Sequence, residues 1–301
     1  VRGLLSLVFS LCGVILFSVS LLFSESLTFF WLFLELVGLS LIPAFFYNYT
    51  GVSFFTLFIY IVVSSISSSF MLFGLLDYNL IFFFILGYLL KFGIFPFFSW
   101  VYSVVLGSNG LVTWLLSVFV KVPFVFISYF LCGFLLNVYD VVSVLCLLTF
   151  VLLSGFFWVY SYNWRCCWCH MLVSSSSILV LMSFNISLDL LFWFFLVYSI
   201  WSTFTVGFIF FFIDGRLDYT FSTSISDFGL FFWFGCIFFL LTTPISLSLF
   251  YKIVTVYCVY SCGWVIIISW VIYSLSEQLF FFKYLVSSYI SKFNFDWFYI
   301  V

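Results

Sequence analysis

Four ionisable residues lie inside long runs of hydrophobic residues: Glu35, Lys91, Lys121 and Lys252. A charge at the centre of a bilayer costs about 2.5–3.5 kcal/mol on insertion scales, so such residues usually pair with each other or line an ion pathway. A lysine in a medium of low dielectric can load and release a proton near neutral pH, and a nearby carboxylate favours its charged form. We therefore expect Glu35 and Lys91 to form a switchable pair, with Lys121 and Lys252 as further proton-handling stations.

Two of these lysines lie close to a proline. Lys91 precedes Gly93 and Pro96, and Lys252 follows Pro244. Proline lacks a backbone N–H and leaves a carbonyl unpaired, so we expect each helix to be interrupted near its lysine. Interrupted helices in the two halves of a chain point to an inverted-repeat transporter core. The breaks therefore favour proton handling over the alternative, in which static ion pairs only fix helix packing.

The composition is that of a membrane protein. Hydrophobic residues make up 67% of the 301 residues and charged residues only 6%, whereas soluble domains are about 25% charged. Successive apolar runs of about twenty residues predict an all-α polytopic membrane protein. The net charge of −2 provides no basic surface, so nucleic acid is not an expected partner.

The apolar runs predict about ten or eleven transmembrane spans, depending on how an interrupted span is counted. We expect the last helix to cover about 262–284 and a short aromatic tail to follow it. Glu277 and Lys283 lie near the end of that helix, where we expect them to extend to the membrane interface. The expected helices are about 3–23, 27–47, 52–75, 79–100, 110–132, 139–160, 168–184, 187–213, 228–260 (interrupted) and 262–284.

A second candidate site is a cysteine and histidine motif. Cys166, Cys169 and His170 match C-x-x-C-H, a haem-attachment pattern. Haem would also need a pocket and usually a second axial ligand, whereas this segment opens an apolar helix. Covalent haem therefore remains a minor alternative, and structural zinc is less favoured, since no second Cys/His pair follows. We expect no metal site.

Two serine runs, 64–69 and 174–177, lie within apolar spans. Small hydroxyl residues let helices approach closely, so packing is their expected role, although the second run could also support a file of water molecules. Ala44 is the only alanine and Gln278 the only glutamine, while residues with thymine-rich codons are abundant. This bias indicates an organellar gene.

Several segments, in this order, resemble one membrane-protein family. The matching stretches are Trp31 to Glu35 with Pro43, Lys91 to Val101, Trp114 to Lys121 with Pro123, Ser175–Ser176, and Pro244 to Lys252. Together they resemble the antiporter-like subunits of respiratory complex I, in particular the family of mitochondrially encoded NADH–ubiquinone oxidoreductase chain 2. The resemblance covers about 25–260, the expected antiporter-like core of a single integral membrane domain, 1–301.

The resemblance implies that Glu35, Lys91, Lys121 and Lys252 form a charged axis at mid-membrane depth. These residues would couple quinone reduction elsewhere in an H⁺-translocating NADH:ubiquinone reductase to proton movement. Glu35 with Lys91 would gate the charge, Lys121 would be the central carrier, and Lys252 would connect to the exit or to a neighbouring subunit.

The resemblance also implies where the chain works and with what. The location would be the mitochondrial inner membrane, and the partners would be other membrane-arm subunits, including antiporter-like chains, and lipids such as cardiolipin. No cofactor is expected on this chain, because it has no motif for one. NAD, FMN, iron–sulfur clusters and ubiquinone would be bound elsewhere in the complex.

The chain departs from the family pattern in three places. Tyr102–Ser103 stands where the family has Pro–Glu, Lys121 is two residues from Pro123, and an aliphatic residue near Leu179 or Val180 replaces a histidine. Two other assignments stay open. One is a free-standing cation/proton antiporter or a sister antiporter-like subunit, and the other is a structural membrane scaffold with static buried ion pairs.

Overall fold

The fold is an all-α bundle. The computed structural model describes residues 2–24, 26–47, 51–77, 80–122, 136–161, 163–210 and 234–296, and no strand occurs in these ranges. Seven helices in them are long and apolar enough to cross a membrane, and three shorter apolar helices accompany these. The chain is therefore a multi-pass membrane protein, as predicted.

The helices follow the expected order. Parts of the predicted spans at 110–132, 187–213 and 228–260 lie outside the described residues, as does Pro123. The elements are α1 (Arg2–Leu22), α2 (Leu27–Leu41) with η1 (Ile42–Phe46), α3 (Gly51–Leu76), α4 (Ile81–Phe92), α5 (Ser99–Gly107), α6 (Gly110–Val118) with η3 (Phe119–Lys121), α8 (Leu136–Val159), α9 (Trp164–Asn185), α10 (Leu188–Phe208), α12 (Leu247–Val259) with η5 (Tyr260–Cys262), and α13 (Trp264–Asp296).

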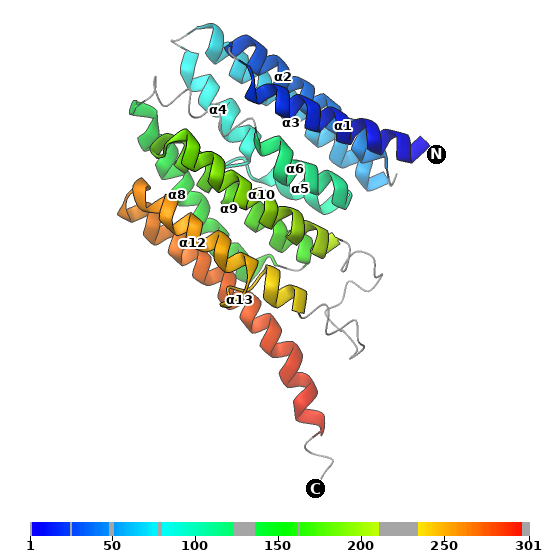
Figure 1. Cartoon of the computed structure of the whole chain (residues 1–301), viewed down its shortest axis with the longest axis vertical. Coiled ribbons are helices and arrows are strands. Elements are labelled where there is room, and N and C mark those ends of the chain that lie inside the picture. Colours follow the sequence, from blue (N-terminus) through cyan, green and yellow to red (C-terminus); the bar gives the residue numbers. More distant parts are fainter. Residues whose placement is uncertain are drawn as a thin grey trace.

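Helix α9 forms the centre of the bundle. In Figure 1, α1–α3 lie on one side of the molecule and α12 and α13 on the other, with α9 between them. It packs against α5, α8, α10 and α12, and 94% of the residues in its most apolar stretch are buried. Its serines are small enough to let four neighbours approach closely. The buried side chains of α9, Cys166 to Ser183, are therefore available to other helices.

The break beside Lys91 is closed by a glycine cap. The helix predicted at about 79–100 ends instead at Phe92, because Gly93 adopts a left-handed conformation with φ 65°. Gly93 N–H donates to Leu90 O at 3.2 Å and Ile94 N–H to Leu89 O at 3.1 Å, which is the Schellman pattern. Trp100 at the start of α5 donates its indole N–H to Leu90 O at 2.8 Å. Leu90 O thus accepts two hydrogen bonds at the break.

The second break separates a helical segment at 234–239 from α12. Residues 240–246, with Pro244 among them, are not helical. Ser246 caps α12 by accepting from Leu249 N–H at 3.1 Å. Gln278 of α13 accepts from Thr242 N–H at 2.9 Å and donates to Leu240 O at 3.2 Å. Both predicted breaks are present, and each is held by a polar side chain from another helix.

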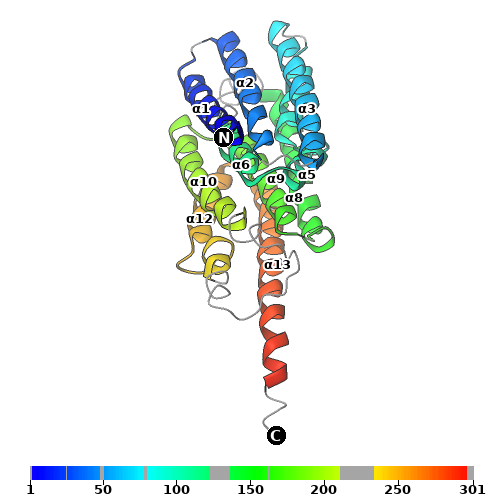
Figure 2. The same cartoon turned by 90° about the vertical axis from the view of Figure 1, so that its right-hand side faces the viewer.

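Two helix boundaries differ from prediction. Helix α9 begins at Trp164 and not at 168, so Cys166, Cys169 and His170 lie within its first two turns. Helix α13 has 33 residues and extends to Asp296, well past the predicted end at 284. After Gly263 the sequence contains no glycine or proline to stop the helix. Figure 2 shows the last part of α13 projecting beyond the other helices.

We predict that Gly93→Ala weakens the first break. A Cβ at this position would lie 2.4 Å from Val101 Cγ2 on a backbone with positive φ. The left-handed conformation alone costs a residue with a Cβ about 1–2 kcal/mol. The thermal midpoint of the purified protein should therefore fall, whereas Gly155→Ala, inside α8 where a Cβ meets nothing within 4 Å, should not lower it, because Ala is favoured over Gly inside a helix. Equal midpoints for the two variants would contradict the cap assignment.

Candidate functional site

Lys121 is held by uncharged groups on the central helix. Its side chain is 3% exposed. Nζ donates to Leu172 O at 2.9 Å, Ser175 Oγ at 2.7 Å and Tyr198 OH at 2.9 Å. The ammonium has three donors, so these acceptors satisfy it. Nζ also lies 4.8 Å from the centre of the Tyr198 ring, where a cation–π attraction adds to the hydrogen bonds.

The residues around Lys121 are themselves anchored. Tyr198 OH donates to Ser117 O at 2.9 Å, and Ser175 Oγ donates to Leu172 O at 2.8 Å. The site thus joins α6 with η3, α9 and α10. Ser175 lies in a run that the sequence singled out, whereas Tyr198 was missed. The sequence feature that could have revealed it is that Tyr198 is the only tyrosine of the predicted span 187–213.

Glu35 and Lys91 are near each other without direct contact. Lys91 is 9% exposed, and neither its Nζ nor the buried Oε1 of Glu35 has a hydrogen-bond partner among the described residues. The two groups lie within electrostatic range of each other. Lys91 also occupies the last turn of α4, where the helix dipole favours a cation. The predicted pair is thus brought together, with its charges coupled and not locked in a salt bridge.

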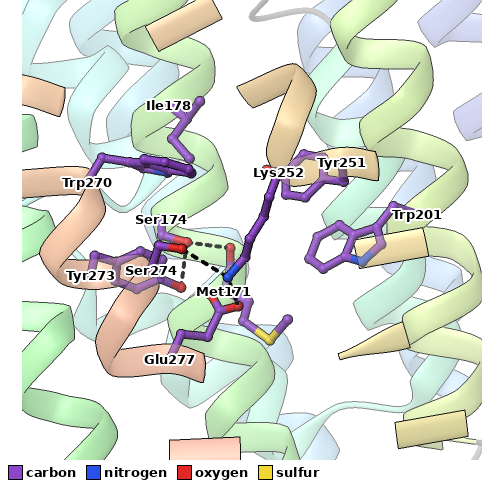
Figure 3. A pocket seen from close by; sticks show the side chains of 10 residues that line it. All are labelled: Met171, Ser174, Ile178, Trp201, Tyr251, Lys252, Trp270, Tyr273, Ser274 and Glu277. Atoms are coloured by element: carbon purple, nitrogen blue, oxygen red, sulfur yellow. Dashed lines mark hydrogen bonds and ion pairs between the residues drawn. The ribbon is translucent and has the colours of Figure 1, made fainter. Parts of the chain in front are cut away.

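Lys252 forms an ion pair that the sequence analysis did not predict. Its Nζ lies 2.9 Å from Oε1 of Glu277 and donates to Ser274 Oγ at 3.1 Å. Figure 3 shows Lys252 of α12 and Glu277 of α13 meeting across the pocket. Glu277 is 5% exposed, so the expectation that it extends to the membrane interface was wrong. Lys283, on the same helix, is exposed.

The pattern of α13 explains why Glu277 is buried. Ile266, Trp270, Tyr273, Glu277 and Phe281 are spaced by three or four residues and are all buried. This spacing places them on one helix face. The signal was therefore present in the sequence, as a carboxylate in register with large apolar residues. It was outweighed by the nearness of Glu277 to the expected helix end.

A small cavity lies beside the Lys252–Glu277 pair. Its volume is about 20 Å³, enough for about one water molecule. Ser174 and Tyr273 line it together with the ion pair, and Ser174 Oγ donates to Tyr273 OH at 2.8 Å. The hydroxyl groups and the ion pair make this a polar cavity inside an otherwise apolar bundle.

Adjacent serines on α9 connect the surroundings of two lysines. Ser175 binds Lys121, and Ser174 lines the cavity of Lys252. Successive residues of an α-helix point in directions about 100° apart, because 3.6 residues make a turn. One turn of α9 therefore serves both sites. The chain brings Glu35 to Lys91 and links Lys121 to Lys252 through α9, but Lys121 and Lys252 share no direct hydrogen bond.

The Cys/His motif packs inside the bundle. His170 is fully buried, and its Nδ1 is hydrogen-bonded to Tyr102 OH at 2.5 Å. Its Nε2 lies 3.9 Å from Cys166 Sγ, and the Phe157 ring centre is 4.8 Å from the imidazole centre. Both ring nitrogens thus face protein groups, an arrangement that gives the haem alternative no support. No group of three or more His, Cys, Asp or Glu residues within the described ranges could hold a metal ion.

Tyr102, at one of the departures from the pattern that the sequence resembles, has a buried partner in His170. The two residues join α5 to α9. Leu179 and Val180, at the other departure, are buried and apolar. Near them Ser177 and Thr149 share a hydrogen bond at 3.0 Å.

Solved structures of three membrane complexes contain chains of this fold. A chain of the membrane-bound sulfane sulfur reductase, an archaeal respiratory membrane complex, has a TM-score of 0.65 at 16% identity, over 84% of this chain and 60% of that one. A chain of the Mrp complex from Dietzia sp. DQ12-45-1b has a TM-score of 0.73 at 13% identity, over 90% of this chain and 58% of that one. A chain of respiratory complex I from Thermus thermophilus with bound aureothin has a TM-score of 0.60 at 15% identity, over 93% of this chain and 75% of that one.

These likenesses establish the fold as an all-α polytopic bundle that also occurs in chains of membrane complexes. This chain spans about three fifths of the length of the first two similar chains. No protein-family model and no curated protein sequence matches it.

We predict that Tyr198→Phe destabilises the Lys121 site while keeping the aromatic ring. The change removes one acceptor from Lys121 and one donor from Ser117 O. Hydrogen bonds inside membrane proteins contribute about 0.6 kcal/mol on average and up to about 1.7, so the two together predict a loss of about 1–2 kcal/mol. Thermal unfolding of the purified protein measures it. Tyr257→Phe, at a side chain that is 70% exposed, is the matched control, and an equal midpoint in both would contradict the assignment.

Proposed function

We propose that this chain is a membrane-arm subunit of a proton-pumping NADH:ubiquinone oxidoreductase, with Lys121 as the central proton carrier. The observation that carries the proposal is the Lys121 site, where a buried lysine is held entirely by neutral groups at the crossing of three elements. The shared fold supports an antiporter-like role, since the fold occurs in a complex I chain and in an Mrp complex chain. The motif resemblance supports the assignment to mitochondrial chain 2 and to the mitochondrial inner membrane.

The Lys121 site can accommodate both charge states. With the amine protonated, Tyr198 and Ser175 accept from Nζ. When the amine loses its proton, its nitrogen gains a lone pair, and either hydroxyl can rotate to donate to it, because hydroxyl groups both donate and accept. A carboxylate in direct contact would instead hold the charged form. Neutral partners therefore suit a carrier that has to release its proton.

Glu35 and Lys91 would act as the gate. The absence of a direct hydrogen bond between them leaves Lys91 free to change its protonation state while Glu35 still influences it. Lys252 would connect to the exit or to a neighbouring subunit. The chain's own residues would move and hold protons, while NAD, FMN, iron–sulfur clusters and ubiquinone would bind elsewhere in the complex. Other membrane-arm subunits and lipids such as cardiolipin would be its partners.

Lys121→Met tests the carrier role. We expect the complex to assemble, because Met fills a similar volume and removes the buried charge. Proton pumping should fall by at least about tenfold, since a proton-transferring side chain typically contributes about 10²–10⁴-fold. The measurements are the proton-to-electron ratio and the NADH oxidation rate in sealed vesicles. Lys283→Met, at an exposed lysine, is the control. A Lys121→Met complex that assembles and keeps the normal proton-to-electron ratio would contradict the carrier role and favour the scaffold alternative.

A free-standing cation/proton antiporter is the second candidate, favoured by the likeness to the Mrp complex chain. Copurification separates the two. We expect the chain to copurify with NADH dehydrogenase activity from detergent-solubilised membranes. A chain that purifies alone and exchanges Na⁺ for H⁺ in liposomes would replace the respiratory assignment.

A further inference from the structure

The carboxylate of Glu277 is tied both to a lysine of the charged axis and to a helix break. Its Oε1 lies 2.9 Å from Lys252 Nζ and accepts from Gln278 Nε2 at 3.0 Å. Glu277 belongs to α13, which lies outside the segment that resembles the antiporter-like core. The family motifs therefore give this residue no role, and only its position in the bundle brings it to Lys252.

Gln278 joins this carboxylate to the backbone of the interrupted helix. Its Oε1 accepts from the N–H of Thr242 at 2.9 Å and from its hydroxyl at 3.1 Å, and its Nε2 also donates to Leu240 O at 3.2 Å. An amide has two donor hydrogens and an oxygen with two lone pairs. All four positions are thus used, three on the break and one on Glu277. A movement of residues 240–246 would pull on the carboxylate through this amide.

We propose that Glu277 is the positioning counter-charge of Lys252 in proton translocation, and that Gln278 couples this ion pair to the break at 240–246. The inference rests on the proposed function and extends its site to α13. While Glu277 holds Lys252 in its charged form at the cavity, the lysine keeps its proton. Displacement of the break withdraws the carboxylate and weakens that hold, so Lys252 can release its proton into the cavity.

The surroundings of the pair fit a switch better than a sealed structural bridge. Two of the three donors of Lys252 are used by Glu277 and Ser274. The cavity beside them is lined by Ser174 and Tyr273 and has room for about one water molecule. Figure 3 shows these side chains gathered around Nζ and the carboxylate. A proton leaving Lys252 thus has polar groups next to it, on the α9 turn that also carries Ser175.

The first experiment removes the charge of Glu277 and keeps its shape. In Glu277→Gln the side-chain oxygen can still accept from Gln278, so a merely structural contact is retained. We expect the assembled complex to lose proton pumping to the level of Lys252→Met, and Lys252→Met/Glu277→Gln to be no worse than either single variant, because two residues acting as one unit are not additive. Glu277→Asp, which keeps the charge, should restore part of the proton-to-electron ratio. Lys283→Gln is the control on the same helix.

The second experiment breaks the coupling and keeps the charge. Gln278→Leu leaves Glu277 and Lys252 in place but removes the bonds to Leu240 and Thr242. We expect a lowered proton-to-electron ratio at normal assembly. An assembled Gln278→Leu complex with the normal ratio would overturn the coupling.

The outcomes separate this inference from the proposed function. Normal pumping in Glu277→Gln together with impaired pumping in Lys252→Met and Lys121→Met overturns the role of Glu277 and leaves the function intact. Normal pumping in Glu277→Gln, Lys252→Met and Lys121→Met alike overturns the proposed function itself. If Glu277→Gln does not assemble, the thermal midpoints of Glu277→Asp and of Lys252→Met/Glu277→Gln decide. We expect the double variant to be no less stable than Lys252→Met, because it leaves no unpaired charge. A double variant that loses the stability of both residues additively would refute the pairing.

Discussion

A charge buried in a bilayer has to be stabilised by groups of the protein, and this requirement organises the centre of the molecule. Three lysines inside the bundle, two of them buried and Lys252 partly so, meet it in three ways. Lys121 is surrounded by neutral oxygens, Lys252 contacts a carboxylate, and Lys91 lies near a carboxylate without touching it. The three lysines therefore differ in the groups that stabilise their charge.

Helix α9 makes this arrangement possible. It contributes little hydrophobicity of its own compared with its neighbours, and nearly all of its surface is covered by other helices. Ser175 and Ser176 donate to Leu172 O one turn earlier, so these hydroxyls are satisfied within the helix, and Ser175 still accepts from Lys121. Hydroxyl groups are stable on this helix because other helices cover them.

The two helix breaks use a shared device. Each frees backbone groups that the bilayer could not satisfy, and at each a polar side chain from another helix bonds the backbone: Trp100 at the first and Gln278 at the second. The indole donates to a carbonyl next to Lys91, and the amide of Gln278 bonds both the break and the carboxylate of Glu277, the partner of Lys252. Backbone irregularity and charge are thus supported by the same polar side chains.

The sequence by itself determined the membrane class, the helix order, both breaks and the four central charges, because apolar length, proline and charge act locally along the chain. It did not determine which residues would meet. Glu277 lies 25 positions from Lys252 and Tyr198 lies 77 from Lys121, and nothing local distinguishes a carboxylate near a helix end from one buried in the bundle. The length of α13 and the packing of α12 against α9 and α13 decided which residues meet. Three lysines with one glutamate left the buried charges unbalanced, and only the tertiary structure supplied the second carboxylate, because a charge in hydrocarbon is stabilised by whichever helices pack around it.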